Sequence, residues 1–421
     1  MEKKKLLILA HYYYPDTAST GQLLKDEAEG MLDIFDVSVI CVVPSYGGVI
    51  EDKYKVQKYY YEDINGVKVT RVRVPEFSKD NKISRIKNIV VYFWGAIGAM
   101  IRSGKQDYVF TMSQPPIIGG LLGVIGKWSK HAKMIYCIQD FNPEQIMAVN
   151  YSNNKLLLKI LMLLDKFSCR QSNLVITVGR DLVETLNSRF HNKNVPNHVM
   201  INNWIDEKQI YPLPEDDENV KAFKRKYGLE NKFIIMYSGN IGLYYDLENL
   251  IQVIKQFKPG TKTQDGREIA FVFVGAGAVL DKLVSYTKEN HMNNVVYIPY
   301  QNKEDLIYSL NSGDVHWVEN SKGIKGVSCP SKFYGVASAG QPVLGVLEKG
   351  SEIRMVIEEI GCGLVCDPGE YAEIEKNIQW FISNAGSDVL KSMGSKAREY
   401  LLEHFTKDVS IQKYIDVIET L

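Results

Sequence analysis

Short apolar runs alternate with longer amphipathic stretches along the first half of the chain. The apolar runs predict strands, and most of the stretches between them have the spacing of helices. The predicted strands are Leu6–Ala10, Val37–Val43, Lys68–Val74, Tyr108–Met112, Met134–Ile138 and Leu174–Val178. Strands that alternate with helices are typical of a parallel sheet with helices on both faces.

The same pattern starts again in the second half of the chain. Its predicted strands are Phe233–Ser238, Ile269–Val274, Val295–Ile298, Val315–Val318, Val343–Val346 and Gly363–Val365. The repeat predicts an α/β protein with two doubly wound, Rossmann-like parallel-sheet domains that face each other across a cleft. In such sheets, ligands bind at the carboxyl ends of the strands.

The length of the chain also favours two domains. At 421 residues it exceeds the size at which one hydrophobic core usually suffices. The segment Tyr211–Glu218 is rich in proline and acidic residues, as is typical of a linker. We therefore predict a first domain over residues 1–206 and a second over residues 207–404.

Composition and charge argue against several classes of function. Lys and Arg together number 50, as do Asp and Glu, so the chain lacks the basic excess of a nucleic-acid-binding protein. The six cysteines are scattered, and the pair Cys362 and Cys366 has no second pair or histidine cluster to complete a zinc site. Free thiols fit a cytoplasmic location. Without an Asp-x-Asp motif or a metal-ligand cluster, the sequence predicts neither a metal nor a cofactor.

The longest apolar stretch, Ile89 to Ile101, is too short to span a bilayer comfortably. It lies within Lys82–Lys105, together with basic and aromatic residues that include Arg85 and Trp94. A helix of this kind can lie in a membrane interface. More often such a helix is simply buried, so both interpretations stay open.

A polar loop with a lysine precedes a predicted helix in the second half. It runs Gly326-Val327-Ser328-Cys329-Pro330-Ser331-Lys332-Phe333-Tyr334. Unpaired N–H groups at a helix start, with the hydroxyl of Ser331 and the cation of Lys332, suit a phosphate. An ordinary turn with a surface lysine explains the same pattern.

Two glycine-containing turns follow the first two strands of the second half. One is Gly239-Asn240-Ile241-Gly242, and the other is Gly275-Ala276-Gly277. Glycine at a strand-to-helix turn lets backbone N–H groups approach a phosphate closely. Each motif alone is weak, because a plain turn has the same composition.

The stretch from Gly326 to Leu344 resembles the sugar-nucleotide loop of retaining glycosyltransferases of family 4. It is most similar to the branch that builds bacterial O-antigen, capsule and exopolysaccharide, which includes N-acetyl-fucosamine transferases. That branch carries G-V-S-x-P-S-K-x-Y and then A-A-G-x-P-V-L, and the resemblance covers nearly the whole chain. It implies the GT-B fold, in which a C-terminal helix, here about residues 405–421, packs back on the first domain.

The resemblance assigns the second half to binding of a nucleotide-sugar donor, with a UDP-sugar as substrate. Many relatives carry Arg and Lys in the first glycine turn, where this chain has Asn240 and Tyr245. Lys332 is then the best candidate for the missing charge, and Arg180 is a second one. The implied donor-binding set is Gly239, Asn240, Gly242, Gly275, Gly277, Ser328, Ser331, Lys332 and Arg180.

The family's pair of glutamates, eight positions apart, is missing. Val327 and Gly335 occupy those positions, so the ribose must be bound differently. Glu352 is a conceivable substitute, but we favour its interpretation as a solvated carboxylate at a helix start.

The segment Asp140-Phe141-Asn142-Pro143-Glu144 follows a predicted strand and resembles the branch's D-x-x-P-E motif. Carboxylates at this place can orient sugar hydroxyls or accept a proton from the acceptor. A capped helix start is the structural alternative. The implied catalytic residues are Asp140, Glu144 and Lys332. Many relatives have His where this chain has Gln139, so this position cannot make the contacts of an imidazole.

The resemblance also assigns the loop after the first strand to the acceptor side, through Tyr14, Thr20 and Gly21. We expect a metal-independent, retaining glycosyltransferase that transfers a sugar, N-acetylated in our hypothesis, from a UDP-sugar to a lipid-linked glycan precursor. Peripheral contact with the cytoplasmic face of the membrane would fit that acceptor. A sugar-nucleotide epimerase on the same scaffold, or a non-catalytic subunit that binds a sugar nucleotide, are the alternatives.

Overall fold

The computed structural model describes residues 2–16, 18–78, 81–148 and 154–421. The chain divides into two compact units. Unit 1 contains Met1–Asn202 and Asp408–Leu421, and unit 2 contains Asn203–Lys407. The division lies a few residues before the boundary that the linker composition predicts, and the C-terminal segment joins unit 1.

Unit 1 is built on a sheet with the strand order β3-β4-β2-β1-β5-β6-β7-β8. All neighbouring strands are parallel except β3 and β4, which are antiparallel. The strands are β1 (Lys4–Leu9), β2 (Phe35–Val42), β3 (Tyr59–Ile64), β4 (Val67–Val72), β5 (Tyr108–Met112), β6 (Lys133–Ile138), β7 (Leu174–Thr177) and β8 (His198–Met200).

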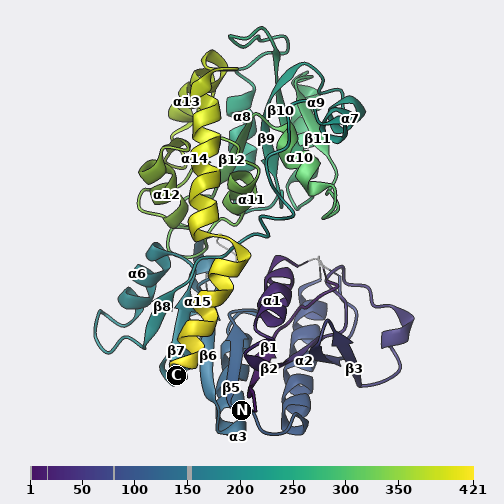
Figure 1. The fold of residues 1–421 in the computed structure, drawn as a ribbon, viewed down its shortest axis with the longest axis vertical. Coiled ribbons are helices and arrows are strands. Elements are labelled where there is room, and N and C mark those ends of the chain that lie inside the picture. The colour runs from purple at the N-terminus through teal and green to yellow at the C-terminus, as the bar shows by residue number, and fades with distance from the viewer. Residues whose placement is uncertain (1, 17, 79–80, 149–153) are drawn as a thin grey trace. The chain divides into compact units, whose positions relative to one another are not determined.

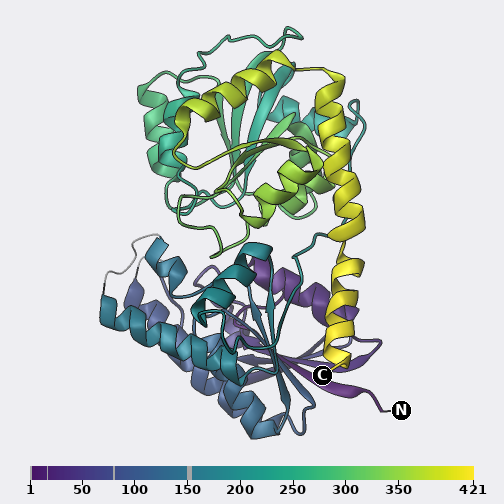
Figure 2. The ribbon, with the colours of Figure 1, turned by 90° about the vertical axis from the view of Figure 1, so that its left-hand side faces the viewer.

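Helices cover both faces of this sheet, which is why its central strands are apolar throughout. The helices are α1 (Ser19–Gly30), α2 (Lys82–Arg102), α3 (Ile118–Lys130), α4 (Glu144–Ala148), α5 (Lys155–Gln171), α6 (Arg180–Arg189) and α15 (Lys407–Glu419), with a 3₁₀ turn at Asp52–Tyr54. Figure 2 shows α15 on one side of the sheet and α5 on the other.

Alternate residues of β5 illustrate the two faces. Val109 joins the core beneath α2 and α3, whereas the ring of Phe110 lies 6.0 Å from the ring of Tyr414 in α15. The hydroxyl of Tyr414 also lies 3.5 Å from the sulfur of Cys137 in β6. The C-terminal helix therefore packs over β5 and β6 (Figure 1).

Unit 2 has a second, wholly parallel sheet with the order β11-β10-β9-β12-β13-β14. Its strands are β9 (Lys232–Ser238), β10 (Glu268–Val274), β11 (Val295–Ile298), β12 (Val315–Glu319), β13 (Val343–Val346) and β14 (Gly363–Cys366). Its helices are α7 (Glu218–Lys226), α8 (Leu247–Ile254), α9 (Leu280–Glu289), α10 (Leu306–Ser312), α11 (Lys332–Ser338), α12 (Glu352–Ile360), α13 (Tyr371–Ser383) and α14 (Asp388–His404).

All the strands that the hydrophobic pattern predicts are present, and the predicted fold class is confirmed for each unit. Two strands were not predicted. The edge strand β3 pairs with β4 through the turn Asn65-Gly66, where both residues have positive φ. The strand β8 has three residues, too few to leave a pattern.

The described part of the chain contains no helix long and apolar enough to cross a membrane. The segment Lys82–Lys105 forms the helix α2, which packs on the sheet of unit 1 through Tyr92, Ala96 and Met100.

Candidate functional site

The two glycine turns of unit 2 interlock at the carboxyl ends of β9 and β10. Gly239 and Gly275 have φ values of 149° and 141°, which residues with a side chain rarely adopt. A Cβ atom on Gly275 would lie 1.9 Å from the carbonyl oxygen of Gly239, and one on Gly277 would lie 2.2 Å from that of Ile241. The Gly239 amide donates to the carbonyl of Val274 at 2.9 Å. Only glycine allows the two turns to meet so closely.

Asn240 fills the bend of the first turn. A Cβ atom on Gly242 would lie 2.9 Å from the Nδ2 atom of Asn240, so the glycine makes room for that side chain. The hydroxyl of Tyr237 donates to the carbonyl oxygen of Asn240 and fixes the backbone there. The structure thus places Gly239, Asn240, Gly242, Gly275 and Gly277 together.

Lys332 lies against these turns. It is the first residue of α11, and its Cε atom is 2.8 Å from the place where a Cβ atom of Gly239 would be. Its Nζ atom lies 3.2 Å from the ring centroid of Tyr245 and 4.9 Å from that of Tyr237. Aromatic rings stabilise a cation on their faces. The lysine that the sequence singled out is therefore in the same place as the glycine turns.

The two serines of the lysine loop flank Lys332 in sequence. Ser331 precedes α11, is exposed and makes no capping hydrogen bond with its side chain. Ser328 is half-buried, and its amide donates to the carbonyl of Ile324 at 3.3 Å. Their roles in donor binding stay predictions.

Glu319, at the end of β12, is a carboxyl group that sequence reasoning missed. Its side chain is 1% exposed, and neither carboxyl oxygen has a hydrogen-bond partner among the described residues. Burial raises the pKa of Glu319, and the nearby Lys332 opposes that rise. Burial also lowers the pKa of Lys332, which Glu319 in turn opposes. The hydrophobic pattern ends the predicted strand at Val318, whereas β12 extends to Glu319. Sequence reasoning therefore did not place Glu319 in the strand.

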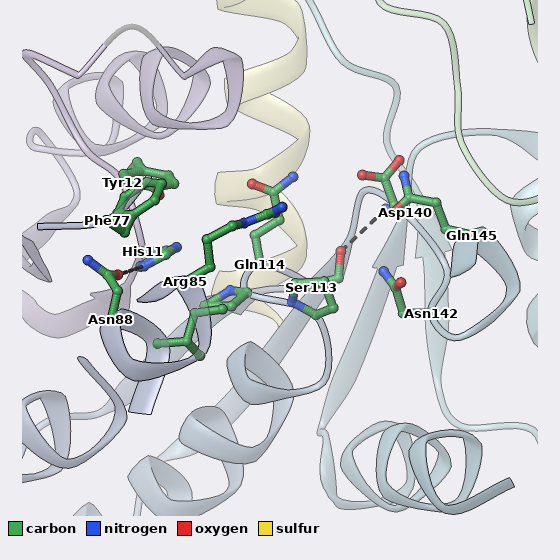
Figure 3. A pocket seen from close by; sticks show the side chains of 13 residues that line it. His11, Tyr12, Phe77, Arg85, Asn88, Ser113, Gln114, Asp140, Asn142 and Gln145 are labelled. Carbon is green, nitrogen blue, oxygen red and sulfur yellow. Dashed lines mark hydrogen bonds between the residues drawn. The ribbon is translucent and has the colours of Figure 1, made fainter. Parts of the chain in front are cut away.

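Unit 1 contains a pocket of about 180 Å³ at the carboxyl edge of its sheet. Figure 3 shows its side chains in two groups, with Arg85, Gln114 and Ser113 between them. The lining residues are His11, Tyr12, Phe77, Arg85, Asn88, Ile89, Ser113, Gln114, Pro115, Pro116, Asp140, Asn142 and Gln145. Amides, hydroxyls, rings and one carboxylate make this lining suited to a polar, hydroxyl-rich ligand.

Neighbouring strands bring the pocket residues together. His11 follows β1, Ser113 follows β5 and Asp140 follows β6, and these strands adjoin in the sheet. Arg85 and Asn88 come from α2. The amide of Asp140 donates to the Ser113 hydroxyl oxygen at 3.3 Å.

The pocket has an uncharged histidine and a charged arginine. Burial lowers the pKa of His11 to about 4, so its ring is neutral at physiological pH. Its Nε2 atom lies 3.4 Å from Oδ1 of Asn88. Burial, followed by the charge of Asp16, raises the pKa of Tyr12, and Arg85 opposes the rise. Arg85 is therefore near the phenol of Tyr12, and it is the cation of this lining.

Asp140 and Glu144 have different surroundings. Asp140 lines the pocket, but Glu144 does not. Both carboxylate oxygens of Glu144 accept hydrogen bonds from the buried Arg189, the first at 2.7 Å. Arg189 also pairs with the buried Asp165 and donates to the carbonyl of Asn142 at 2.7 Å. This geometry favours a structural role for Glu144, as the anchor of the segment that carries Asp140.

The predicted acceptor-side residues lie beside the pocket rather than in its lining. The Thr20 hydroxyl donates to Oε1 of Gln114 at 2.9 Å. A Cβ atom on Gly21 would come within 3.3 Å of the Tyr12 backbone, so glycine lets α1 approach that loop. The carbonyl of Tyr14 accepts a hydrogen bond from Arg71 at 2.6 Å, and its ring is partly exposed.

Two further predicted residues lie elsewhere. Arg180 begins α6 in unit 1, directly after Gly179. Glu352 begins α12 in unit 2 and is buried. The favoured expectation of a solvated carboxylate is therefore wrong, because α12 packs its first residue inward. Within the described part of the chain, no group of three or more His, Cys, Asp and Glu side chains is arranged to hold a metal ion.

The turns and the lysine loop fall within a segment with known relatives. Residues 219–400 match the family model "Glycosyl transferases group 1". The chain is 23% identical to the probable glycosyltransferase WbjE of Pseudomonas aeruginosa over 83% of its own length and 84% of that protein. It is 21% identical to the putative colanic acid biosynthesis glycosyl transferase WcaI of Escherichia coli over 98% and 99% of the two chains. The chain is thus similar to the group 1 model over residues 219–400 and to named glycosyltransferases over most of its length.

Solved structures show the same fold as this chain. Sucrose-phosphate synthase from Thermosynechococcus elongatus superposes with a TM-score of 0.76 at 12% identity, covering 99% of each chain. Anabaena HepE in complex with UDP and glucose superposes with a TM-score of 0.70 at 14% identity, covering 99% of this chain and all of that one. These neighbours support the GT-B architecture of two Rossmann-like α/β units.

Proposed function

We propose that this protein is a retaining glycosyltransferase that transfers a sugar from a UDP-sugar to a lipid-linked glycan precursor. In this proposal the sugar is N-acetylated and the product enters capsule, O-antigen or exopolysaccharide synthesis, by similarity to the N-acetyl-fucosamine transferase branch. The names of WbjE and WcaI support a role in glycan assembly, and the UDP complex of HepE supports a uridine diphosphate donor.

The observation that carries the proposal is the position of Lys332. Its amine lies at the carboxyl edge of the unit 2 sheet, over the interlocked turns of Gly239 and Gly275. Parallel sheets bind nucleotides at this edge. Glycine turns leave room for phosphate oxygens, and a lysine supplies the opposite charge.

In the proposed reaction the bond between the sugar C1 and the diphosphate oxygen breaks, and a bond from the acceptor oxygen to C1 forms on the same face. The proton of the acceptor hydroxyl moves to the departing diphosphate. Lys332 would stabilise the charge that develops on this leaving group, so no metal is required. Asp140 would hold the acceptor hydroxyl through its carboxylate.

The pocket of unit 1 suits the saccharide part of the acceptor. Tyr12 and Phe77 offer ring faces, and Asn88, Gln114 and Asp140 offer polar groups for hydroxyls. Sugar hydroxyls need such partners when they leave water. We assign the pocket to the acceptor on this chemistry.

Exposed apolar residues on two helices of unit 1 support contact with a membrane. On α2, Ile83, Ile86, Val90 and Trp94 are exposed, at a spacing that places them along one side of the helix. On α5, Leu156, Ile160, Leu163 and Phe167 repeat this arrangement, and the ring of Phe167 lies 6.0 Å from that of Trp128 in α3. We propose that these helices, which also carry several Lys and Arg residues, lie on the cytoplasmic face of an anionic membrane.

Release of UDP tests the proposed reaction. The protein is mixed with a UDP-sugar, with a lipid-linked saccharide, and with both. A transferase releases UDP when both are present and converts the acceptor. Conversion of the donor sugar without acceptor would instead identify an epimerase, and binding without any turnover would identify a non-catalytic subunit.

Flotation with anionic liposomes tests the membrane contact. The triple variant Arg85→Glu/Lys87→Glu/Arg102→Glu of α2 is compared with wild type. Each basic residue near an anionic membrane surface contributes about 1 kcal/mol to binding. We expect salt-sensitive flotation of wild type and weaker flotation of the variant. Equal flotation of both, or none by either, would show that α2 is not the contact.

A further inference from the structure

Arg85 interrupts the buried side of α2 in unit 1. The side chains of Asn88, Tyr92 and Ala96 follow one another at spacings of four residues and are buried. Arg85 stands one turn before Asn88 on the same side of the helix, but it is exposed and lines the pocket. The pocket therefore takes the place of the hydrophobic core at this end of α2, and a cation faces it.

The donors of the Arg85 guanidinium are not used by the fold. No hydrogen bond or ion pair joins this guanidinium to another residue of the described part of the chain. Arg102, at the opposite end of α2, instead donates to the carbonyl of Gly98 at 2.8 Å and lies over the ring of Tyr59. The start of a helix is also the unfavourable end for a cation. Packing therefore does not account for an arginine at this position.

We infer that Arg85 is a specificity-determining residue, which binds the phosphate that joins the acceptor saccharide to its carrier. A guanidinium presents its N–H donors as a planar fork, and this fork matches the oxygens of a phosphate in pairs. The first turn of α2 contains no acidic residue, and Lys82 adds a second positive charge there. Asn81 already caps the first amides of the helix, so the phosphate would be bound by the side chain of Arg85.

The two charges of the pocket would orient such a ligand. Asp140 is the carboxylate of the lining, and it repels an anion. Figure 3 shows Asp140 on the far side of Ser113 from Arg85. The phosphate would therefore lie beside α2, and the saccharide would extend toward Asp140, where the proposed function places the reacting hydroxyl.

A neighbouring side of α2 suits the lipid of the carrier. Ile86, Val90 and Trp94 are exposed and are spaced by four residues, so they lie along one side of the helix. Ile86 directly follows Arg85, which places it about 100° farther around the helix axis. A carrier lipid on this apolar side would leave its phosphate at Arg85. The arrangement therefore favours the phosphate of the linkage over a carboxylate farther along the glycan.

The inference rests on the proposed function, because it takes this pocket as the acceptor site. Three short-chain probes distinguish the possible anions in titrations without donor. The first probe carries N-acetylglucosamine on a citronellyl chain through a diphosphate, and the second carries the same sugar through a neutral ether. The third carries glucuronic acid through that ether. Each is titrated into wild type, Arg85→Gln and Lys87→Gln. Lys87 is the matched control, since it is an exposed cation of the same helix outside the pocket lining.

Wild type and Lys87→Gln should bind the diphosphate probe roughly 10- to 100-fold more tightly than the ether probe, as hydrogen bonds to a charged group would give. Arg85→Gln should lose most of this preference and bind the ether probe within about twofold of wild type. Arg85→Lys keeps the charge without the fork and should retain part of the preference. No preference in wild type, no binding of any probe, or an equal loss in Lys87→Gln would overturn the inference. A preference for the glucuronic acid probe alone, lost in Arg85→Gln, would assign Arg85 to a sugar carboxylate and would overturn it as well.

Transfer kinetics then separate this inference from the proposed function. With a UDP-sugar as donor and the diphosphate probe as acceptor, Arg85→Gln should raise the acceptor KM by about tenfold, and more than it lowers kcat. Transfer by both proteins with the same acceptor KM would refute the role of Arg85 and leave the proposed function standing. If no lipid-linked acceptor is converted although the three probes bind as expected, the proposed function fails and the phosphate site at Arg85 stands.

Discussion

Arg189 in unit 1 and Lys332 in unit 2 are both cations near the carboxyl edge of a parallel sheet, but they are held differently. Arg189 is buried and pairs with Asp165 and Glu144. Lys332 is half-buried, and its amine lies over the rings of Tyr245 and Tyr237. Each nitrogen of the Arg189 guanidinium donates at least one hydrogen bond, so this cation holds its own segment in place. A cation that rests on a ring keeps its donors for a ligand.

The same contrast separates the two predicted carboxylates. Glu144 belongs to the Arg189 network, and Asp140 stands four residues earlier in the pocket lining. We therefore expect substitutions in the network to act on stability and substitutions at Lys332 and Asp140 to act on turnover.

The largest effect is expected for Arg189→Ala. The change leaves the buried carboxylate of Asp165 without its cation, with the Tyr136 hydroxyl as its remaining donor. Loss of one partner of a buried ion pair typically costs about 3–5 kcal/mol. Urea unfolding followed by circular dichroism measures the loss, with the exposed Lys193→Ala as control. A loss below about 1 kcal/mol would show that the network does not support unit 1.

Lys332→Ala should lower turnover by about 100-fold with the fold intact. Removal of one preorganised group that stabilises developing charge typically has an effect of this size. Release of UDP measures the rate, and the unfolding transition confirms the fold. A folded variant with nearly wild-type turnover would refute the role of Lys332.

Asp140→Asn should lower kcat by about 10- to 100-fold while UDP binding stays unchanged, because the acceptor hydroxyl loses its anionic partner. Glu144→Gln is the comparison variant and should chiefly lower the free energy of unfolding. The opposite pattern, with Asp140→Asn active and a folded Glu144→Gln inactive, would exchange their assignments.

Acid should weaken both units, since each contains one buried neutral histidine. Burial lowers the pKa of His11 and of His316 to about 4 in the folded protein. A histidine in the unfolded chain has a pKa near 6.5. The contribution of the two residues to stability is therefore fully present above pH 6.5 and is lost as the pH falls toward 4. Between pH 6.5 and 5.5, each histidine should lower the free energy of unfolding by about 1 kcal/mol. Thermal unfolding of His11→Gln and His316→Gln across this range measures it, and an unchanged slope would contradict burial in the neutral form.

The hydrophobic pattern predicted the fold well because both sheets are covered on both faces. Their strands are apolar throughout, and this signal survives without knowledge of the tertiary contacts. The edge strand β3 has the sequence Tyr59-Tyr60-Tyr61-Glu62-Asp63-Ile64 and only partial burial. The turn Asn65-Gly66 was the available signal for its hairpin.

The candidate site was only partly predictable. Motif residues such as Lys332 and Gly239 stand in recognisable segments, and the structure brings them together. Arg85 and Asn88 reach the pocket from α2, two strands and a helix before Asp140 in the chain, so only the folded chain relates them to Asp140. Glu319 could have been noticed as a polar residue directly after the predicted strand. The absence of hydrogen-bond partners for its oxygens among the described residues is a property of the packing.

Titration of UDP into wild type, Lys332→Ala and Asp140→Asn tests most directly whether unit 2 binds the donor through Lys332. The account predicts that Lys332→Ala loses UDP affinity by about 100-fold and that Asp140→Asn binds UDP as wild type does. Equal affinity of wild type and Lys332→Ala, or loss of UDP binding in Asp140→Asn alone, would contradict it.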